Sequence, residues 1–450
     1  MNQHEYQRRL LERERRYPDW KPLLADRPVH IRIDSGYAAT YAGQVAAITA
    51  ASLLGRMSTA VSMEVDPVPV LAPLPWESEK LDVVAMRTLK AADPYGCYEH
   101  RPPQTGDFRL VLGPDGDGLV VHGSGWRAYC GREPSPLPQS DELNPFGAAF
   151  AVVAAASRLP QVMQAAAIEP VFVDTYNWRT GPESSNSAAV SPDFNLGELW
   201  CIGVGSVGSC ALFFLGLVTR AFHAVLVDRD VVKVENVRRS ALFTSDDALG
   251  EERKVDVACR WLSEVGVQRI EPHYAWLHEM KEQWVGRETG TPDIVISAAN
   301  EWSVRPQIEN GFPPIQVYGT TGRNWQSTLF RHIPLMDACS LCVPGTEAVQ
   351  MPALCATGEA VSPHGAGEDD VALPFLSYAA GLMTAAEIAK VALTGKIVGR
   401  NRVFFEPRTP NLVRAVTLNR KAGCACGMRD ASMHQTAIRG SRFASLSLKV

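Results

Sequence analysis

The sequence predicts an α/β protein of two domains, the second built around a Rossmann-like βαβ unit. An apolar run at 199–202 ends in the glycine-rich turn GVGSVG, and a helix is expected over 210–220. A second apolar run at 224–227 ends at Asp228, which is the order of a nucleotide-binding βαβ unit. At 450 residues the chain is too long for one compact core, and its first part also alternates strand-like and helix-like segments.

Residues 1–170 form the first predicted domain. Its strand, helix, strand order resembles that of the second domain but lacks the glycine turn. Two interpretations stay open: a diverged copy of the second domain, or an unrelated α/β domain. The expected elements are a charged helix within 1–20, strands at 29–34, 59–66, 108–113 and 118–122, and helices at 37–56 and 146–157, the last stopping before Pro160.

A polar stretch rich in Ser, Asn and Pro predicts a linker over 171–193. The second domain is predicted over 194–428, and residues 429–450 are expected to form a C-terminal tail.

The further elements expected in the second domain follow the βαβ unit. They are a helix over 254–262, strands at 272–277, 293–299 and 314–319, an antiparallel strand within 320–334, a helix over 376–393, and a hairpin of 401–405 with 412–418.

The glycine turn predicts a phosphate-binding site. Gly203 permits the tight turn, Gly205 lets the backbone approach a phosphate, and Gly208 lets the helix pack on the strand. The start of the helix then offers free N–H groups and a positive dipole end to an anion. A glycine-rich turn between two core strands is the alternative, but the flanking strands and the acid at Asp228 favour a nucleotide.

The residues after Asp228 indicate which nucleotide. A nicotinamide dehydrogenase would continue with an ordinary helix. This chain instead presents polar and cationic side chains, which suit the charge of a triphosphate. They are Asp230, Asn236, Arg238, Arg239 and Lys254. Taken alone, Arg238 and Arg239 would read as a solvated surface pair; their spacing favours the phosphate role.

This run, D-x-D-x-V-x-x-x-N-x-x-R followed by a lysine, resembles the ThiF/MoeB/ubiquitin-activating superfamily of adenylating enzymes. The resemblance covers about residues 195–428. It implies that Asp228 holds the ribose hydroxyls of ATP and that Asn236, Arg239 and Lys254 contact its phosphates. The implied fold is a Rossmann-like adenylation domain with zinc-binding cysteine pairs. A diverged α/β domain precedes it, and an inactive adenylation-like domain is one interpretation of that half.

Two close cysteine pairs predict a structural zinc site. Cys339 and Cys342 form a CxxC, and Cys424 and Cys426 form a CxC about eighty residues later. Four thiolates in two pairs match tetrahedral Zn²⁺. The second pair departs from the superfamily's usual CxxC. A redox CxxC is the alternative, which the distant partner pair argues against.

Cys355 lies alone in a Gly- and Pro-containing stretch that reads as a loop. The resemblance implies a loop over 343–374 that crosses the nucleotide pocket and carries a thioester-forming cysteine, so Cys355 is the candidate nucleophile, with an incidental loop cysteine as the alternative. The resemblance also implies an aspartate that holds Mg²⁺ after the strand at 293–299. Asn300 occupies that position here, which leaves Glu301 or Asp230 as substitutes.

Bulk properties exclude several classes of protein. The net charge is −5 without a long basic tract, so nucleic acid is not an expected partner. No apolar stretch reaches the length of a membrane span, and the charged N-terminus lacks a signal-peptide core. We therefore expect a cytoplasmic protein with reduced cysteines and no membrane partner.

The resemblance implies activation of a ubiquitin-like protein in the style of bacterial antiphage conjugation systems. ATP would adenylate the carrier's C-terminal carboxylate, Cys355 would take it as a thioester, and a ubiquitin-conjugating-type enzyme would receive it. A homodimer or a pseudo-dimer of the two domains would supply an arginine, for which Arg8–Arg16 are candidates. The alternatives are adenylation of a sulfur carrier or a ribosomal peptide, and a non-catalytic nucleotide-bound scaffold, which Asn300 would favour.

Overall fold

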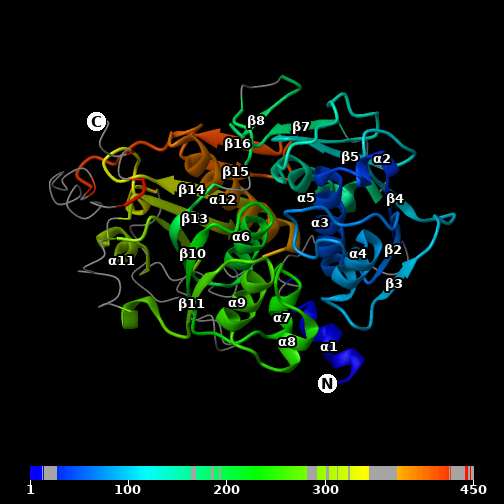
Figure 1. Ribbon diagram of the computed structural model, residues 1–450, viewed down its shortest axis with the longest axis horizontal. Helices are drawn as coiled ribbons and strands as arrows, with labels where there is room; N and C mark the ends of the chain where they lie inside the picture. The colour runs from blue at the N-terminus through cyan, green and yellow to red at the C-terminus, as the bar shows by residue number, and fades with distance from the viewer. Residues whose placement is uncertain are drawn as a thin grey trace.

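The computed structural model describes two α/β halves, each with its own eight-stranded sheet (Figure 1). The described residues are 1–12, 14, 28–163, 169–183, 187–191, 194–280, 291–299, 304–311, 313–322, 325–343, 372–424, 426, 441–443 and 446.

The first sheet has the strand order β3-β2-β1-β4-β5-β6-β7-β8. Neighbouring strands are parallel from β3 to β5, and the pairs from β5 to β8 are antiparallel. The strands are β1 (Val29–Ile33), β2 (Ala60–Glu64), β3 (Cys97–His100), β4 (Phe108–Leu112), β5 (Leu119–Ser124), β6 (Arg127–Gly131), β7 (Val171–Asp174) and β8 (Arg179–Thr180).

The second sheet repeats this order and these directions, as β11-β10-β9-β12-β13-β14-β15-β16. Each strand of the first sheet therefore has a counterpart in the second. The strands are β9 (Gly197–Ile202), β10 (Phe222–Val227), β11 (Arg269–His273), β12 (Ile294–Ser297), β13 (Ile315–Gly322), β14 (Gln326–His332), β15 (Arg402–Phe405) and β16 (Val413–Val416). Of the two interpretations of the first half, the shared topology favours a diverged copy.

Four helices form a layer between the two sheets (Figure 1). Their apolar residues belong to one hydrophobic cluster with strands of both halves, so the halves share a core. At their contact the Ser52 and Tyr378 hydroxyls lie 2.6 Å apart, and the Tyr41 hydroxyl donates to the Leu217 carbonyl. The four are α3 (Tyr41–Met57), α5 (Phe146–Met163), α6 (Ser206–Gly216) and α12 (Pro374–Thr394).

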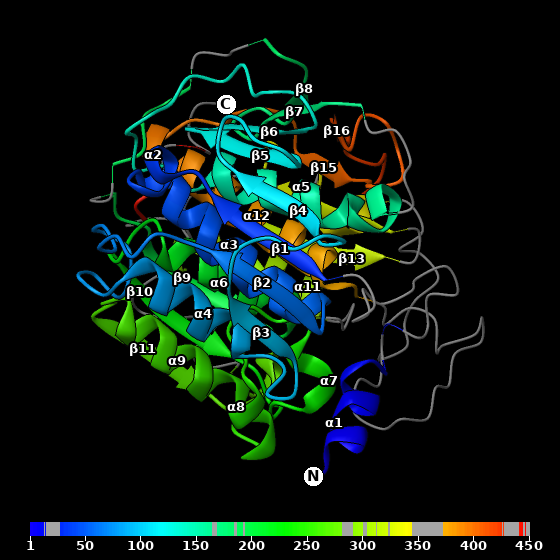
Figure 2. The same ribbon diagram turned by 90° about the vertical axis from the view of Figure 1, so that its right-hand side faces the viewer.

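The remaining helices lie outside this layer. One of them, α1, packs on α7 of the second half, and both views show α1 beside α7 (Figures 1 and 2). The helices outside the layer are α1 (Gln3–Leu10), α2 (Ser35–Ala38), α4 (Leu81–Lys90), α7 (Val234–Val237), α8 (Ser245–Leu249), α9 (Lys254–Glu264) and α11 (Val304–Asn310), with 3-10 turns η2 (Leu277–Met280) and η3 (Ser340–Cys342).

Most predicted elements are confirmed, and four need correction. The helix expected over 210–220 is α6, which begins and ends four residues earlier. The linker expected over 171–193 begins with β7 and β8, because Val171 and Val173 are buried against β6 and the polar composition starts only afterwards. The helix α5 continues through Pro160, since its apolar residues are buried in the shared core. The strand expected at 272–277 is β11, three residues earlier.

The helix α12 is long and apolar enough to cross a membrane by length and composition. However, 89% of its apolar window is buried inside the fold, where it packs against α6, α5 and the strands β13, β14 and β15. This burial identifies it as a core helix.

Candidate nucleotide and metal sites

The turn from β9 into α6 depends on two close backbone approaches. Gly203 has φ +87°, and a Cβ there would lie 2.6 Å from the Ala299 nitrogen. A Cβ at Gly208 would lie 2.0 Å from the Gly203 carbonyl oxygen. At Gly205, by contrast, a Cβ would meet no atom of the described residues within 4 Å. As far as the described residues go, the turn is therefore closed on the side of the sheet and open beside Gly205, next to the first N–H groups of α6.

Asp228, at the end of β10, braces this turn. One carboxylate oxygen accepts the Val204 N–H at 2.7 Å, and the other accepts the Asp230 N–H at 2.8 Å. Burial raises the pKa of Asp228, and the nearby Lys254 charge opposes that rise. From the sequence, Asp228 was expected only to bind the ribose hydroxyls of the nucleotide. The structure shows that its carboxylate also fixes the glycine turn. Each carboxylate oxygen has a further lone pair that can accept a hydroxyl group.

Lys254 and Asp230 form an ion pair beside the turn. The Lys254 ammonium lies 2.6 Å from the Asp230 carboxylate, and the Lys254 N–H donates to the Asp230 carbonyl at 3.0 Å. Burial alone would lower the pKa of Lys254, but the Asp228 and Asp230 carboxylates outweigh it and raise that pKa. The positive charge of Arg239 acts in the other direction and lowers the pKa of Lys254.

The three residues of the N-x-R-R segment have different surroundings. The Asn236 side-chain oxygen accepts the Lys233 N–H at 2.9 Å and so caps α7, and the side-chain NH2 is the group that could donate to a phosphate. Arg239 is buried, with 8% of its surface exposed. The spacing favoured a phosphate role for Arg238 over a solvated surface pair. Arg238 is buried, not solvated, and its guanidinium contacts Glu14 of the first half and the Met57 carbonyl.

Three candidate site residues lie outside the described residues: Cys355, with most of the loop 343–374, and the neighbours Asn300 and Glu301. Arg305, just beyond Asn300, lies on α11 with its guanidinium 5.7 Å from the centre of the Tyr318 ring. Burial lowers the pKa of Arg305.

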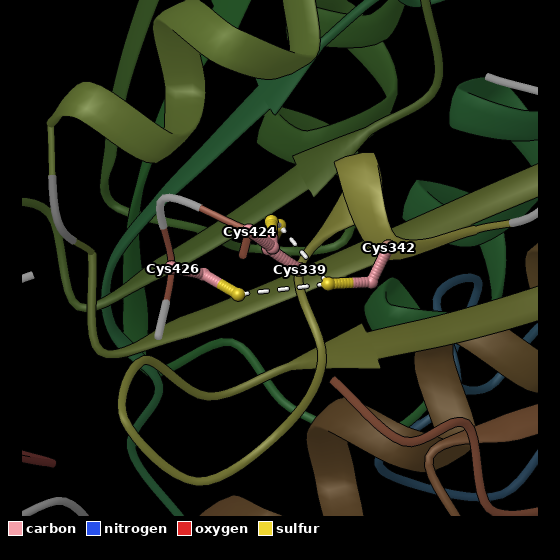
Figure 3. A group of neighbouring side chains, drawn as sticks. All are labelled: Cys339, Cys342, Cys424 and Cys426. Carbon is pink, nitrogen blue, oxygen red and sulfur yellow. Dashed lines mark hydrogen bonds between the residues drawn. The ribbon is translucent and has the colours of Figure 1, made fainter. Parts of the chain in front are cut away.

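The four predicted zinc ligands come together at one point (Figure 3). The Sγ–Sγ distances are 3.8 Å for Cys339–Cys342 and 3.5 Å for both Cys339–Cys424 and Cys342–Cys426. A tetrahedral site with Zn–S bonds of about 2.3 Å places its sulfurs about 3.8 Å apart, so the cluster fits this ion. The Lys421 N–H also donates to the Cys342 sulfur at 3.3 Å, as suits a thiolate.

Behind this cluster lies a buried carboxylate that the sequence analysis missed. One oxygen of Glu309, on α11, accepts both the N–H and the hydroxyl of Ser340 at 2.7 Å. Ser340 lies between the two cysteines of the CxxC, so α11 and the cluster are tied together. The segment IENG around Glu309 gives no signal of this contact, because the sequence places Ser340 thirty-one residues away.

Two substitutions that each add one methyl group should separate the two sides of the glycine turn. We expect Gly208→Ala to lower stability by about 2 kcal/mol or more, because its Cβ overlaps a backbone oxygen. Gly205→Ala should stay within about 0.5 kcal/mol of the unchanged protein. Unfolding midpoints in urea measure both, and equal midpoints for the two variants would contradict the described packing.

Comparison with known proteins agrees with this architecture. The description of the ThiF family matches residues 197–426, just over half of the chain. No curated protein matches the chain.

Several solved structures align with part of the chain. E. coli MccB with ATP aligns with 52% of this chain and 67% of its own, at 12% identity and a TM-score of 0.39. E. coli MccB with MccA-N7isoASN aligns with 51% of this chain and 66% of its own, at 14% identity and a TM-score of 0.39. PaaA aligns with 49% of this chain and 64% of its own, at 14% identity and a TM-score of 0.35. The chain thus spans about two thirds of these proteins' lengths. With a matching family over 197–426 and the fold described above, the chain belongs to the ThiF family.

Proposed function

We propose that the protein uses ATP to adenylate the C-terminal carboxylate of a small protein or peptide. The observation that carries this proposal is a buried cation tied to the glycine turn: the Lys254 ammonium lies 2.6 Å from Asp230, whose N–H bonds Asp228, the residue that braces the turn. Arg239 is also buried, and its carbonyl accepts the Cys210 thiol of the helix that follows the turn. Membership of the ThiF family supports the same activity. Two cations suit the β- and γ-phosphates of a triphosphate better than the diphosphate of a nicotinamide cofactor.

In the proposed reaction the carboxylate oxygen attacks the α-phosphorus of ATP. An O–P bond forms, the bond to the β-phosphate breaks, and pyrophosphate leaves with the electron pair. Lys254 and Arg239 would neutralise the charge that develops on the leaving group. Asp228 would accept the ribose hydroxyls. Asn300, Glu301 or Asp230 would hold Mg²⁺, which would neutralise phosphate charge when bound. The ion pair with Lys254 already occupies one oxygen of Asp230.

We propose further that the carrier is a ubiquitin-like protein and that Cys355 takes its acyl group. The thiolate would attack the adenylate carbonyl, a C–S bond would form, and AMP would leave. A conjugating enzyme's cysteine would then accept the acyl group, in a cytoplasmic, bacterial antiphage pathway. These steps rest on the resemblance of the sequence.

The first half is proposed to be a copy without a nucleotide site, so that the chain is a pseudo-dimer. It has the same strand order, but β1 leads into the short helix α2, where the Asp34 carboxylate caps the helix by accepting the Tyr37 N–H at 2.9 Å. The Tyr37 side chain is buried and its hydroxyl bonds the Gly123 backbone at 3.0 Å. A bulky side chain thus follows β1 where the second half has its glycine turn.

We propose that the four-cysteine cluster holds Zn²⁺ in a structural role. All four ligand positions of a tetrahedral ion are filled by thiolates, which leaves no position for substrate. The ion would join the segment after β14 to the segment after β16, which approach each other at the cluster (Figure 3).

Removing the proposed nucleotide contacts should abolish adenylation. We expect Asp228→Ala and Arg239→Ala each to reduce ATP–pyrophosphate exchange by at least about a hundredfold, because each loses a charged contact to ATP. The assay is run with and without a candidate carrier protein that ends in glycine. Arg87→Ala, an exposed ion-pair residue of α4, is the control. Exchange retained in both pocket variants would refute the assigned pocket.

The thioester step can be tested apart from adenylation. With ATP and the carrier, the protein should form a covalent adduct that a thiol reductant cleaves, and Cys355→Ala should lose it while exchange continues. Cys97→Ala, which removes an exposed cysteine of the first half, should keep the adduct. An adduct that survives Cys355→Ala would assign the thioester elsewhere; exchange without any adduct would favour plain adenylation.

The metal proposal predicts about one zinc per chain in the purified protein. Cys424→Ser should lower zinc content and the unfolding midpoint together, because a missing thiolate opens the site. Cys259→Ser, outside the cluster, should change neither. Elemental analysis and thermal unfolding measure the two quantities, and a metal-free protein of unchanged stability would contradict the proposal.

A further inference from the structure

Arg56, on α3 of the first half, is buried with 2% of its surface exposed, and it grips a turn of the second half. Its Nε donates to the Val237 carbonyl at 3.1 Å and the Ser240 carbonyl at 2.8 Å. One terminal nitrogen donates to the Ala241 carbonyl at 3.1 Å and the Phe243 carbonyl at 2.8 Å. One guanidinium thus holds four backbone carbonyls of the 237–243 turn.

A second contact from the first half holds the same turn. Arg238 forms a buried ion pair with Glu14, and its Nη2 lies 3.2 Å from a Glu14 oxygen. The same nitrogen donates to the Met57 carbonyl at 2.9 Å. Met57 is the last residue of α3, so Arg56 and Met57 hold the turn from one helix end.

Arg239 lies between these anchored residues. Its carbonyl accepts the Cys210 thiol of α6 at 3.8 Å, which fixes the turn against the helix of the glycine motif. Its backbone is therefore held from both halves of the molecule, while its charge acts on Lys254.

We propose that Arg56 and the Glu14–Arg238 pair are positioning residues through which the first half places Arg239 for the β- and γ-phosphates of ATP. This inference rests on the proposed function. It gives the first half a defined role in the nucleotide site although that half has no glycine turn of its own. Arginine is required at 56 because a planar fork can serve four carbonyls, whereas the three N–H groups of a lysine ammonium cannot.

The test compares ATP with AMP, because Arg239 is proposed to meet only the outer phosphates. We expect Arg56→Lys to weaken ATP binding about tenfold, the loss of roughly one charge-assisted contact, and to leave AMP binding within about twofold. Calorimetric titration with Mg²⁺ present measures both. Arg158→Lys is the matched control, since Arg158 is also a buried arginine that donates across to the second half, at the Pro410 carbonyl.

A double-mutant cycle shows whether Arg56 acts through Arg239. In an Arg239→Ala background, Arg56→Lys should cause no further loss of ATP affinity. Additive losses, an equal loss for AMP, or an equal loss in Arg158→Lys would overturn the inference and indicate a general structural role.

A second variant keeps the test decisive if Arg56→Lys does not fold. Glu14→Gln keeps the side-chain shape but removes the charge that holds Arg238, and it should show the same selective loss for ATP. Unchanged ATP affinity in Glu14→Gln, or in a folded Arg56→Lys, would refute the inference. Failure of the unchanged protein to bind ATP would instead refute the proposed function, so the two failures are distinguishable.

Discussion

The close approach of α6 to β9 is the constraint on which the rest of the site depends. Only glycine at 208 lets the helix lie against the Gly203 carbonyl, where a Cβ would come within 2.0 Å. The helix then begins at the end of the strand with its first N–H groups beside Gly205. Asp228 holds the turn from the other side through the Val204 N–H, so the position of the acid and the shape of the turn are fixed together.

The second half depends on the first for more than burial. The four-helix layer places apolar residues of both halves in one cluster. Hydrogen bonds from buried arginine and lysine side chains also join the two halves. Lys390 of α12 illustrates this: its ammonium lies 2.6 Å from Glu387 and donates to the Tyr176 carbonyl of the first half at 3.0 Å. A buried charge in such a contact is costly to leave unpaired, so it specifies how the halves dock. The turn that carries Arg239 is held in the same way, by buried charged side chains of the first half.

The sequence predicted much of the second half because its signals are local. The glycine turn, the strand that ends at Asp228 and each of the two cysteine pairs are short motifs that can be recognised within a few residues of sequence. The structure brings the four cysteines together as expected. Contacts between distant residues could not be predicted: Glu14 with Arg238, Glu309 with Ser340 and Arg56 with the 237–243 turn join positions that no short pattern relates. The repeated strand order was suspected from alternating segments, but β7 and β8 were missed because so short a pair resembles a linker.

The most direct test of the central claim is a crystal structure of the protein with a non-hydrolysable ATP analogue and Mg²⁺. The account predicts the triphosphate at the start of α6, with Lys254 and Arg239 on its outer phosphates and Asp228 on the ribose. A pocket that stays empty at saturating analogue, or a triphosphate bound away from Gly205, would contradict it.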